Sequence, residues 1–426
     1  MSVSLLVLSL LVLLVARVPV AFAILLPCLA FVGMDESITM GIVLQRVAAT
    51  LDSFPLLAVP LFILVGFVAE AAGMADRLIN ALLAIFGRVR GSLGYVNVSG
   101  SLTFSWMSGS ATADAAAMGS VMVPAMKRNG YHGGFAAGLT GASSMIGPIM
   151  PPSVGAILYA VLSGSSVGDM FLAGVLPAFV IAGALCVYVY FHARKRPHLT
   201  TERLGRGESA RAIGAALPVL VTPVIILGGI LGGVFTATEA AAVAGVYLIT
   251  LGLVTRWISI KGLYRALVGT AATTGRVMLI ATAGGMLAYV LAREGAPQQA
   301  ADALLGLTDS PLLFLLLVNV ALLIMGMFLE PASALLISVP VVLPIALEYG
   351  IDPVQLGTIL ILNLSIGLLT PPVGLVLFVL SAVGDVSLSE VIRGTLPGLI
   401  PLGATLLVVT YVPVVTLYLP NLANSG

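Results

Sequence analysis

Charge is the scarcest property of this 426-residue chain. Charged residues make up 9% of it and hydrophobic residues 59%, whereas roughly 25% of the residues in a soluble domain are charged. The mean hydropathy is +1.14, so there are too few polar side chains to cover a water-soluble core of this size. The net charge of +1 supplies no basic field for nucleic acid. These values predict a multi-pass membrane protein without a nucleic-acid partner.

The residue types that carry enzyme chemistry are also few. The two cysteines, Cys28 and Cys186, lie in apolar segments and predict no disulfide framework. The three histidines do not have the spacing of a metal site, and none of the three lysines follows a phosphate-binding glycine loop. We therefore expect neither an enzyme nor an ATPase. The first fifteen residues lack the positive charge and the cleavage site of a signal peptide, so we interpret them as a retained membrane helix.

Long apolar runs are abundant instead. A spanning helix needs about 20 mostly apolar residues. The expected spans are 2–16, 18–33, 55–72, 134–162, 171–192, 213–234, 237–255, 265–292, 353–382 and 395–419. The predicted fold class is therefore an all-α polytopic membrane protein.

Two further apolar stretches, 95–126 and 311–346, are interrupted near their middles by small and polar residues. The interruptions are Ser108-Gly109-Ser110 and Glu330-Pro331-Ala332-Ser333. Each half is about as long as a helix that reaches only mid-membrane, which predicts two re-entrant helical hairpins. A pair of ordinary spans with a kink is the alternative.

The distribution of basic residues supports the two hairpins. Under the positive-inside rule, an external N-terminus makes every basic cluster cytoplasmic, provided that 95–126 re-enters from the cytoplasm and 311–346 from outside. The polar, basic stretch 193–212 is then a cytoplasmic linker between the halves. Residues 34–54 and 75–90 have the pattern of interfacial amphipathic helices.

A double proline occurs in each half, at Pro151-Pro152 and at Pro371-Pro372, and each pair lies inside a long apolar run. Proline breaks a helix and frees backbone carbonyls, which membrane interiors tolerate only where the break lines a protected cavity. We therefore expect broken helices at 134–162 and 353–382. The halves, 1–192 and 213–426, then form an inverted repeat of the kind found in secondary transporters, with the binding site at the breaks.

Hairpin tips and helix breaks bring oxygen donors together. Such groups suit an alkali cation, and free helix N-termini suit an anion; the small residues among them can instead serve close helix packing. The first set comprises Ser105, Ser108, Gly109, Ser110, Thr112, Ser143, Ser144 and Gly147. The second set comprises Gly326, Glu330, Ser333, Asn363, Ser365, Gly367 and Thr370.

Three ionisable residues lie within the predicted membrane region. Asp114 and Glu330 are near the two tips, where intramembrane carboxylates are usually functional, although each could instead cap a hairpin helix. Arg276 lies inside a predicted span. It could meet an anionic substrate or a carboxylate, or extend to the cytoplasmic side.

The segments 108–114 (SGSATAD), 147–153 (GPIMPPS) and 367–374 (GLLTPPVG) resemble the large membrane subunit of TRAP (tripartite ATP-independent periplasmic) transporters. The resemblance runs over essentially the whole chain. It implies an elevator-type transporter in the bacterial inner membrane, coupled to sodium and without another cofactor. It also implies three partners: a small four-helix membrane subunit, a periplasmic substrate-binding protein and a small carboxylate substrate.

The resemblance also implies roles for particular residues. One sodium site would use Ser105, Gly109, Ser144, Gly147 and Pro151, and a second would use Gly326, Gly367 and Thr370. Substrate would lie between the tips, at Ser108, Ser110, Ser153, Glu330, Ser333 and Asn363. The second hairpin departs from the family pattern, which often has an aspartate followed by small or hydroxyl residues where this chain has Glu330-Pro331.

The sequence thus predicts the permease subunit of a sodium-coupled importer of carboxylates such as C4-dicarboxylates or sugar acids. Three alternatives stay open. One is a stand-alone proton- or sodium-coupled anion transporter of related architecture, and another is a membrane anchor subunit that does not transport. The third is a channel, although repeated hairpin breaks suit occlusion better than a continuous pore.

Overall fold

The computed structural model describes residues 3–16, 18–34, 51–87, 89–194, 205–296 and 310–425, with isolated positions at 41, 45, 48, 196, 199, 298 and 299. Within these ranges every regular element is a helix. Seven of the described helices are long and apolar enough to cross a membrane. The amphipathic helix expected at 34–54 lies mostly outside the described residues.

The first half contains the helices that precede the linker. Their bounds are α1 (Val3–Val15), α2 (Val20–Met34), η1 (Phe54–Leu57), α4 (Ala58–Ala71), α5 (Met74–Phe86), α6 (Ser92–Ser108), α7 (Ala111–Arg128), α8 (Gly133–Ser144), α9 (Val154–Ser163) and α10 (Val167–Arg194). The stretch expected to form one re-entrant hairpin is thus α6 and α7, which pack together. The first broken helix is α8 and α9.

The second half has its hairpin, broken helix and closing helix in the same order. Its elements are α11 (Arg206–Pro223), η2 (Val224–Gly228), α12 (Gly229–Leu231), α13 (Ala237–Val254), α14 (Ile260–Arg293), α16 (Pro311–Gly326), α17 (Pro331–Glu348), α18 (Pro353–Gly367), α19 (Leu375–Gly384), α20 (Leu388–Tyr411) and α21 (Val414–Asn424). The second hairpin is α16 and α17. The second broken helix is α18 and α19.

Proline explains where both broken helices stop. The chain leaves α8 after Ser144 and begins α9 at Val154, with Pro151 and Pro152 in the interval. Pro371 and Pro372 occupy the corresponding interval between α18 and α19, and each proline pair is joined by a cis peptide bond. Because proline lacks the N–H that continues the helical hydrogen bonds, both predicted breaks occur where expected.

Several expected boundaries were wrong. The second tip was placed at 330–333, but the break covers 327–330, since Pro331 starts α17 rather than interrupting it. The span expected at 395–419 is two helices, because Pro413 cannot continue α20. The helix within 2–16 has only 13 residues, fewer than a perpendicular span needs.

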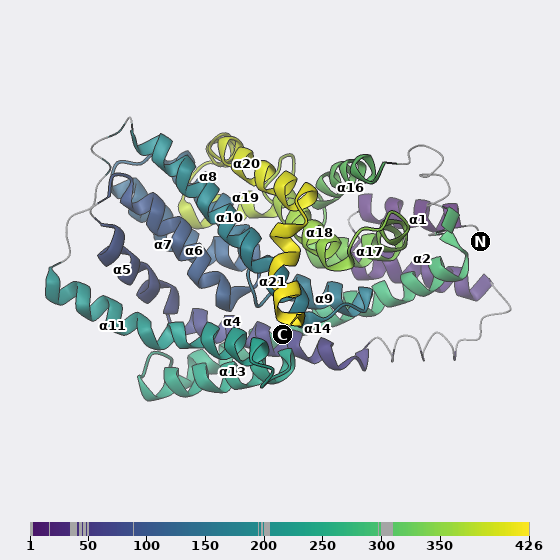
Figure 1. The fold of residues 1–426 in the computed structure, drawn as a ribbon, viewed down its shortest axis with the longest axis horizontal. Coiled ribbons are helices and arrows are strands. Elements are labelled where there is room, and N and C mark those ends of the chain that lie inside the picture. Colours follow the sequence, from purple (N-terminus) through teal and green to yellow (C-terminus); the bar gives the residue numbers. More distant parts are fainter. Residues whose placement is uncertain are drawn as a thin grey trace.

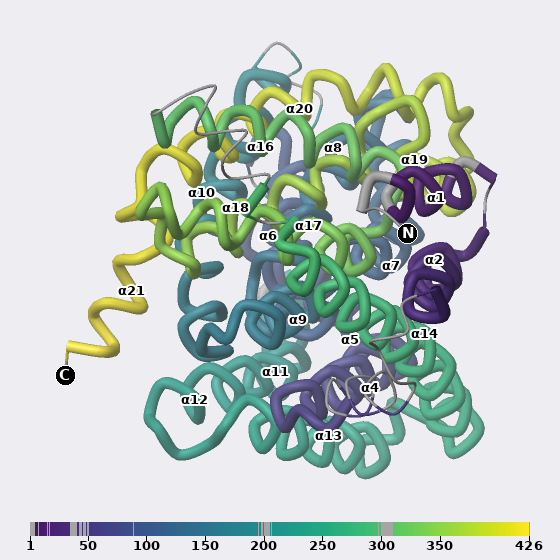
Figure 2. The backbone as a smooth tube through the Cα atoms, turned by 90° about the vertical axis from the view of Figure 1, so that its right-hand side faces the viewer, coloured from purple at the N-terminus to yellow at the C-terminus, as the bar shows by residue number. Residues whose placement is uncertain are grey.

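The helices form two groups that α5 connects (Figures 1 and 2). One group consists of α1, α2, α4, α11, α13 and α14, with α4 packed between α13 and α14. The other group contains both hairpins, both broken helices and α10, α20 and α21. The groups meet where α14 packs on α17 and where α4 packs on α6.

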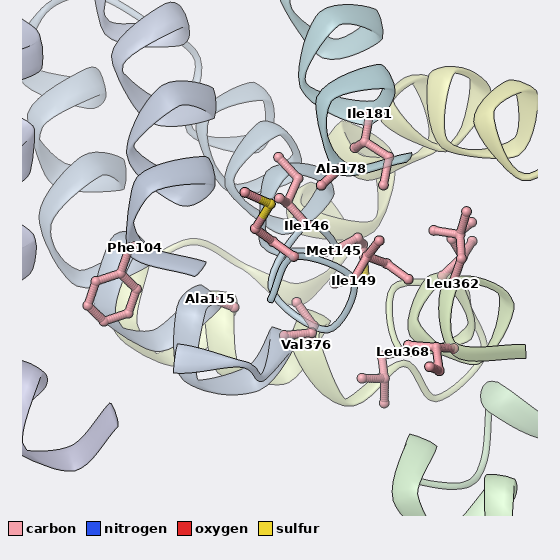
Figure 3. Close-up of a cluster of buried hydrophobic side chains, with 14 of the residues drawn as sticks. Phe104, Ala115, Met145, Ile146, Ile149, Ala178, Ile181, Leu362, Leu368 and Val376 are labelled. Atoms are coloured by element: carbon pink, nitrogen blue, oxygen red, sulfur yellow. The ribbon is translucent and has the colours of Figure 1, made fainter. Parts of the chain in front are cut away.

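The two breaks lie against each other in the core of the second group. Met145, Ile146 and Ile149 of the first break are buried. Figure 3 shows their side chains near Leu368 and Val376, which flank the second break. Within a membrane such contacts stabilise through van der Waals packing rather than through transfer from water, and here they hold the two breaks against each other.

Candidate functional site

The tip of the first hairpin is a tight turn made by Gly109. Its φ of +58° lies in the left-handed region, where a side chain is disfavoured. A methyl group there would lie 2.7 Å from the carbonyl oxygen of Pro152. Glycine therefore lets the first tip touch the first break directly.

Carbonyl oxygens converge on Gly147 in that break. A methyl group at this position would lie 3.2 Å from the Ser110 oxygen and 3.3 Å from the Ser144 oxygen. The Ser144 hydroxyl donates to the Gly141 carbonyl (2.8 Å), which leaves the lone pairs of its own oxygen able to accept a cation. The tip and the break thus present several oxygens to one small volume.

The second half brings its tip and break together in a related way. Gly326, the last residue of α16, lies against Gly367, the last residue of α18: a methyl group on Gly367 would lie 2.9 Å from the Gly326 oxygen. The Gly374 amide, at the end of the second break, donates to the carbonyl of Met327 in the second tip (3.3 Å). The Thr370 hydroxyl donates to the Ile366 carbonyl (2.8 Å), the same backbone-directed pattern that Ser144 shows.

The two halves are not identical at this contact. Gly147 meets Ser110, which precedes the second helix of its hairpin, whereas Gly367 meets Gly326, which ends the first helix of its hairpin. Ser110 and Glu330 occupy equivalent positions, since each is the residue before the second hairpin helix. Neither side chain caps its helix by a hydrogen bond.

The remaining predicted residues near the first and second tips differ in their hydrogen bonds and burial. Ser153 caps α9 by accepting from the Ala156 amide (3.1 Å), and its hydroxyl also donates to the Pro148 carbonyl. The Ser105 hydroxyl donates to the Ser101 carbonyl one turn above the tip. Ser333 is buried in the first turn of α17. Ser108 has a buried hydroxyl oxygen with no hydrogen-bond partner among the described residues.

Asn363 lies in a helix interface rather than at a tip. Its amide donates to the Asn319 side chain (2.6 Å) and to the Asn319 carbonyl (3.0 Å), which joins α18 to α16. The first half has a comparable pair of bonds, from Asn97 to Thr140 (2.7 Å) and between Ser101 and Ser143 (2.9 Å). Each hairpin is therefore tied to its broken helix by buried polar side chains.

Sequence reasoning missed Asn97, Thr140 and Asn319. The available signal was an amide in the middle of an apolar helix, since a buried polar group needs a partner on a neighbouring element. The sequence alone does not reveal which element that is.

The intramembrane carboxylates have different surroundings. Asp114 is fully buried in the first turn of α7, and neither carboxylate oxygen has a hydrogen-bond partner among the described residues. Glu330 is exposed at the second tip, within electrostatic range of Arg276 on α14. Arg276 also donates to the Ala272 carbonyl (3.3 Å) of its own helix. The guanidinium thus faces a carboxylate across the boundary between the two helix groups.

The donor set favours an alkali cation over a transition metal. The described residues contain no group of three His, Cys, Asp or Glu side chains that could hold a metal ion. The tips and breaks instead offer hydroxyls and backbone carbonyls, which are hard ligands. Beside them, the N-termini of α7 and α17 present free N–H groups suited to an anion. Oxygen ligands and helix N-termini therefore lie side by side.

The chain is similar to known proteins over most of its length. Residues 7–415 match the family model described as the DctM component of the tripartite ATP-independent periplasmic transporter. The chain is 43% identical to the sialic acid TRAP transporter large permease protein SiaM of Vibrio cholerae, over 96% of both chains. It is 41% identical to the C4-dicarboxylate TRAP transporter large permease protein DctM of Pseudomonas aeruginosa, over 87% of both.

The fold is also similar to that of a solved transporter. The crystal structure of the Alcanivorax borkumensis YdaH transporter superposes with a TM-score of 0.63 at 16% identity, covering 88% of this chain and 89% of that one. At this identity the likeness concerns the fold alone.

Proposed function

Because the chain belongs to the tripartite ATP-independent periplasmic transporter family, as a DctM component, we propose that it imports a small organic acid together with sodium. The family consists of membrane transporters, so the chain is a large permease subunit and not an enzyme. The convergence of carbonyl oxygens on Gly147 carries the sodium part of this proposal.

The substrate class follows from chemistry common to the relatives. Sialic acid and C4-dicarboxylates, which two relatives carry by name, both have a carboxylate. The N-termini of α7 and α17 adjoin the tips, and their free N–H groups favour a carboxylate. Ser108, Ser110 and Ser333 lie beside these ends and supply hydroxyl donors. The acid would therefore bind between the tips, with Ser153 and Glu330 around it, whereas the buried bond of Asn363 to Asn319 argues against the expected contact of Asn363 with substrate.

Two sodium ions would bind at the two contacts between tip and break. The first would use oxygens of Ser105, Gly109, Ser144, Gly147 and Pro151. The second would use those of Gly326, Gly367 and Thr370. Filling both sites offsets the charge of the carboxylate, and a neutralised site crosses a membrane interior far more easily than a bare charge.

The helix groups suggest how the site would move. The group with both hairpins and both broken helices would carry substrate and ions as one body, while α1, α2, α4, α11, α13 and α14 would stay fixed. This is the elevator mechanism. A small four-helix membrane subunit and a periplasmic binding protein that delivers the acid would complete the transporter.

Uptake into proteoliposomes tests the proposal. The full chain, reconstituted with its small subunit and binding protein, is given radiolabelled N-acetylneuraminate or succinate with either an inward sodium gradient or an equal choline gradient. We expect one of the two acids to be taken up, and only when both the binding protein and the sodium gradient are present. Equal uptake with choline would disprove sodium coupling, and uptake without the binding protein would favour a stand-alone transporter.

A further inference from the structure

A cavity of about 420 Å³ lies away from both tips and both breaks, where three helix ends meet. Its walls come from the start of α8, the end of α10 and the start of α20. Small-molecule sites commonly have this size. The central linker begins at this place, since it follows α10 directly. The cavity therefore faces the side that the positive-inside rule predicts to be cytoplasmic.

Two arginines, Arg196 and Arg393, supply the positive charge of the lining, and Glu390 is the single acid among the lining residues. Nδ1 of His132 accepts from the Gly134 amide (3.2 Å), so that ring acts as an acceptor rather than as a charge. The Glu390 carboxylate accepts from the hydroxyl of Ser387 (3.1 Å), the N-cap residue of α20, so it takes part in capping the start of that helix. Arg393 has neither a hydrogen bond nor an ion pair with any described residue. Its guanidinium is available to a ligand.

Packing holds the other arginine in position. The Arg196 guanidinium contacts Nε2 of His192 (2.9 Å) and donates to the His192 carbonyl (3.2 Å). The His192 ring stacks on Phe135 with a centroid distance of 3.4 Å, and Phe135 packs on Tyr188. A side chain that is ordered before binding loses less entropy when it binds.

Two helix N-termini add to this positive potential. α8 starts at Gly133 and α20 at Leu388, and the backbones of the two helices touch where Gly394 lies against Gly134. Their positive ends are therefore close together at the cavity. Aligned N–H groups at a helix start favour an anion, and two guanidiniums beside them raise the local positive charge further.

We propose that this cavity is a binding site for a phosphate-bearing anion, separate from the transport site. The two guanidiniums outweigh the single Glu390 carboxylate of the lining, and arginine binds phosphate through paired hydrogen bonds. The phosphate could belong to an anionic lipid or to a soluble compound. Tyr190 and Phe191, exposed near the end of α10, are of the type found at lipid headgroup level.

Binding measurements on the full chain distinguish these sources. Purified protein in detergent is titrated with inorganic phosphate, and with succinate for comparison, while its Tm is followed. In parallel, native mass spectrometry counts phosphatidylglycerol retained from nanodiscs that also contain phosphatidylcholine. We expect phosphate, phosphatidylglycerol or both to bind, and succinate to bind much more weakly than phosphate. Binding of phosphate would identify the ligand as a soluble compound, and retention of phosphatidylglycerol would identify it as a lipid.

Arg393→Gln tests the location. The side chain is exposed and unpaired, so the protein should fold normally and bind the anion about tenfold more weakly, as expected for one lost charged hydrogen bond. Arg211→Gln, another exposed arginine, is the matched control and should bind like wild type. Three results would overturn the proposal. They are unchanged binding in Arg393→Gln, no binding of either phosphate or lipid, and binding of succinate as strong as that of phosphate. None of these readouts depends on transport.

Discussion

At the scale of single residues, glycine allows backbone oxygens to approach one another at the tips and breaks. Gly109 brings the first tip against Pro152, and Gly147 lies beside the carbonyls of Ser110 and Ser144. In the proposed sodium sites, a side chain at either glycine would occupy space next to the ion. The proposal therefore depends on the absence of side chains at these two positions, and on hydroxyls such as that of Thr370.

Gly147→Ala should weaken sodium binding. The added methyl group would lie 3.2 Å from the Ser110 oxygen, inside the proposed first site. We expect the sodium concentration for half-maximal uptake to rise about tenfold, which corresponds to about 1.4 kcal/mol. Gly183→Ala is the control, because no heavy atom lies within 4 Å of the added methyl group. Equal sodium dependence in the two variants would contradict a cation site at Gly147.

Thr370→Val should act on the second sodium site. The substitution keeps the shape of the side chain and removes an oxygen whose lone pairs face away from its bond to Ile366. We expect a severalfold rise in the sodium requirement, restored by Thr370→Ser. Thr255→Val is the control. It removes a hydroxyl that makes the same kind of bond, to the Leu251 carbonyl (2.6 Å), at a position far from the tips in the sequence. If both variants shift the sodium dependence alike, Thr370 has no special role.

At the scale of elements, the broken helices hold their shape because neighbouring helices pack tightly around them. α20 lies along α8 with Gly394 against the Gly134 backbone and Gly138 against Gly394. The hairpins are tied to the same helices by the bonds of Asn97 and Asn319. A buried amide left without a partner costs about 1–3 kcal/mol. Sliding a hairpin along its broken helix would break these bonds, so they favour a single alignment of the two.

Gly394→Val should destabilise the protein strongly. Its side chain would overlap the Gly134 carbonyl, forcing α8 and α20 apart at a cost on the order of 3 kcal/mol. A lowered Tm or a loss of monodisperse protein in size-exclusion chromatography reports this. Gly403→Ala in the same helix has open space around the methyl group and should leave the Tm unchanged or slightly higher. A normal Tm for Gly394→Val would show that the two helices do not pack as described.

At the scale of the whole molecule, the two helix groups meet at α14 with α17, at α4 with α6 and α9, and at α11 with α6. Arg276 and Glu330 face each other across this boundary. An unbonded charge pair at such a boundary can separate without breaking a network of hydrogen bonds. This organisation is compatible with the proposed sliding of one group against the other.

A disulfide across the boundary should stop that movement. In a variant with Cys28 and Cys186 replaced by alanine, the pair Gly284→Cys and Leu336→Cys would join α14 to α17. A Cβ on Gly284 would lie 2.7 Å from that of Leu336, so the helices must move apart by about 1 Å to reach the Cβ separation of a disulfide. We expect oxidation to abolish uptake and reduction to restore it.

The matched control pair lies within one group. Val123→Cys and Gly384→Cys would join α7 to α19, with a Cβ separation of 3.3 Å, and oxidation should leave uptake intact. Full uptake with the α14–α17 disulfide formed would exclude the elevator mechanism. Mass spectrometry of the oxidised protein confirms that each disulfide is complete.

The sequence by itself determined the membrane class, the hairpin at 108–110 and both broken helices, because hydropathy and proline act locally on the backbone. It also identified the family, through segments whose glycines and prolines are needed where the backbone leaves the helix. Only the tertiary structure decided which oxygens meet: that Gly147 faces Ser110, that Gly367 faces Gly326, and that Asn363 bonds to Asn319. Such contacts join residues tens of positions apart through the packing of whole helices, and no local pattern in the chain encodes that packing. The cationic cavity at Arg393 has the same origin, since its walls come from three helices that are distant in sequence.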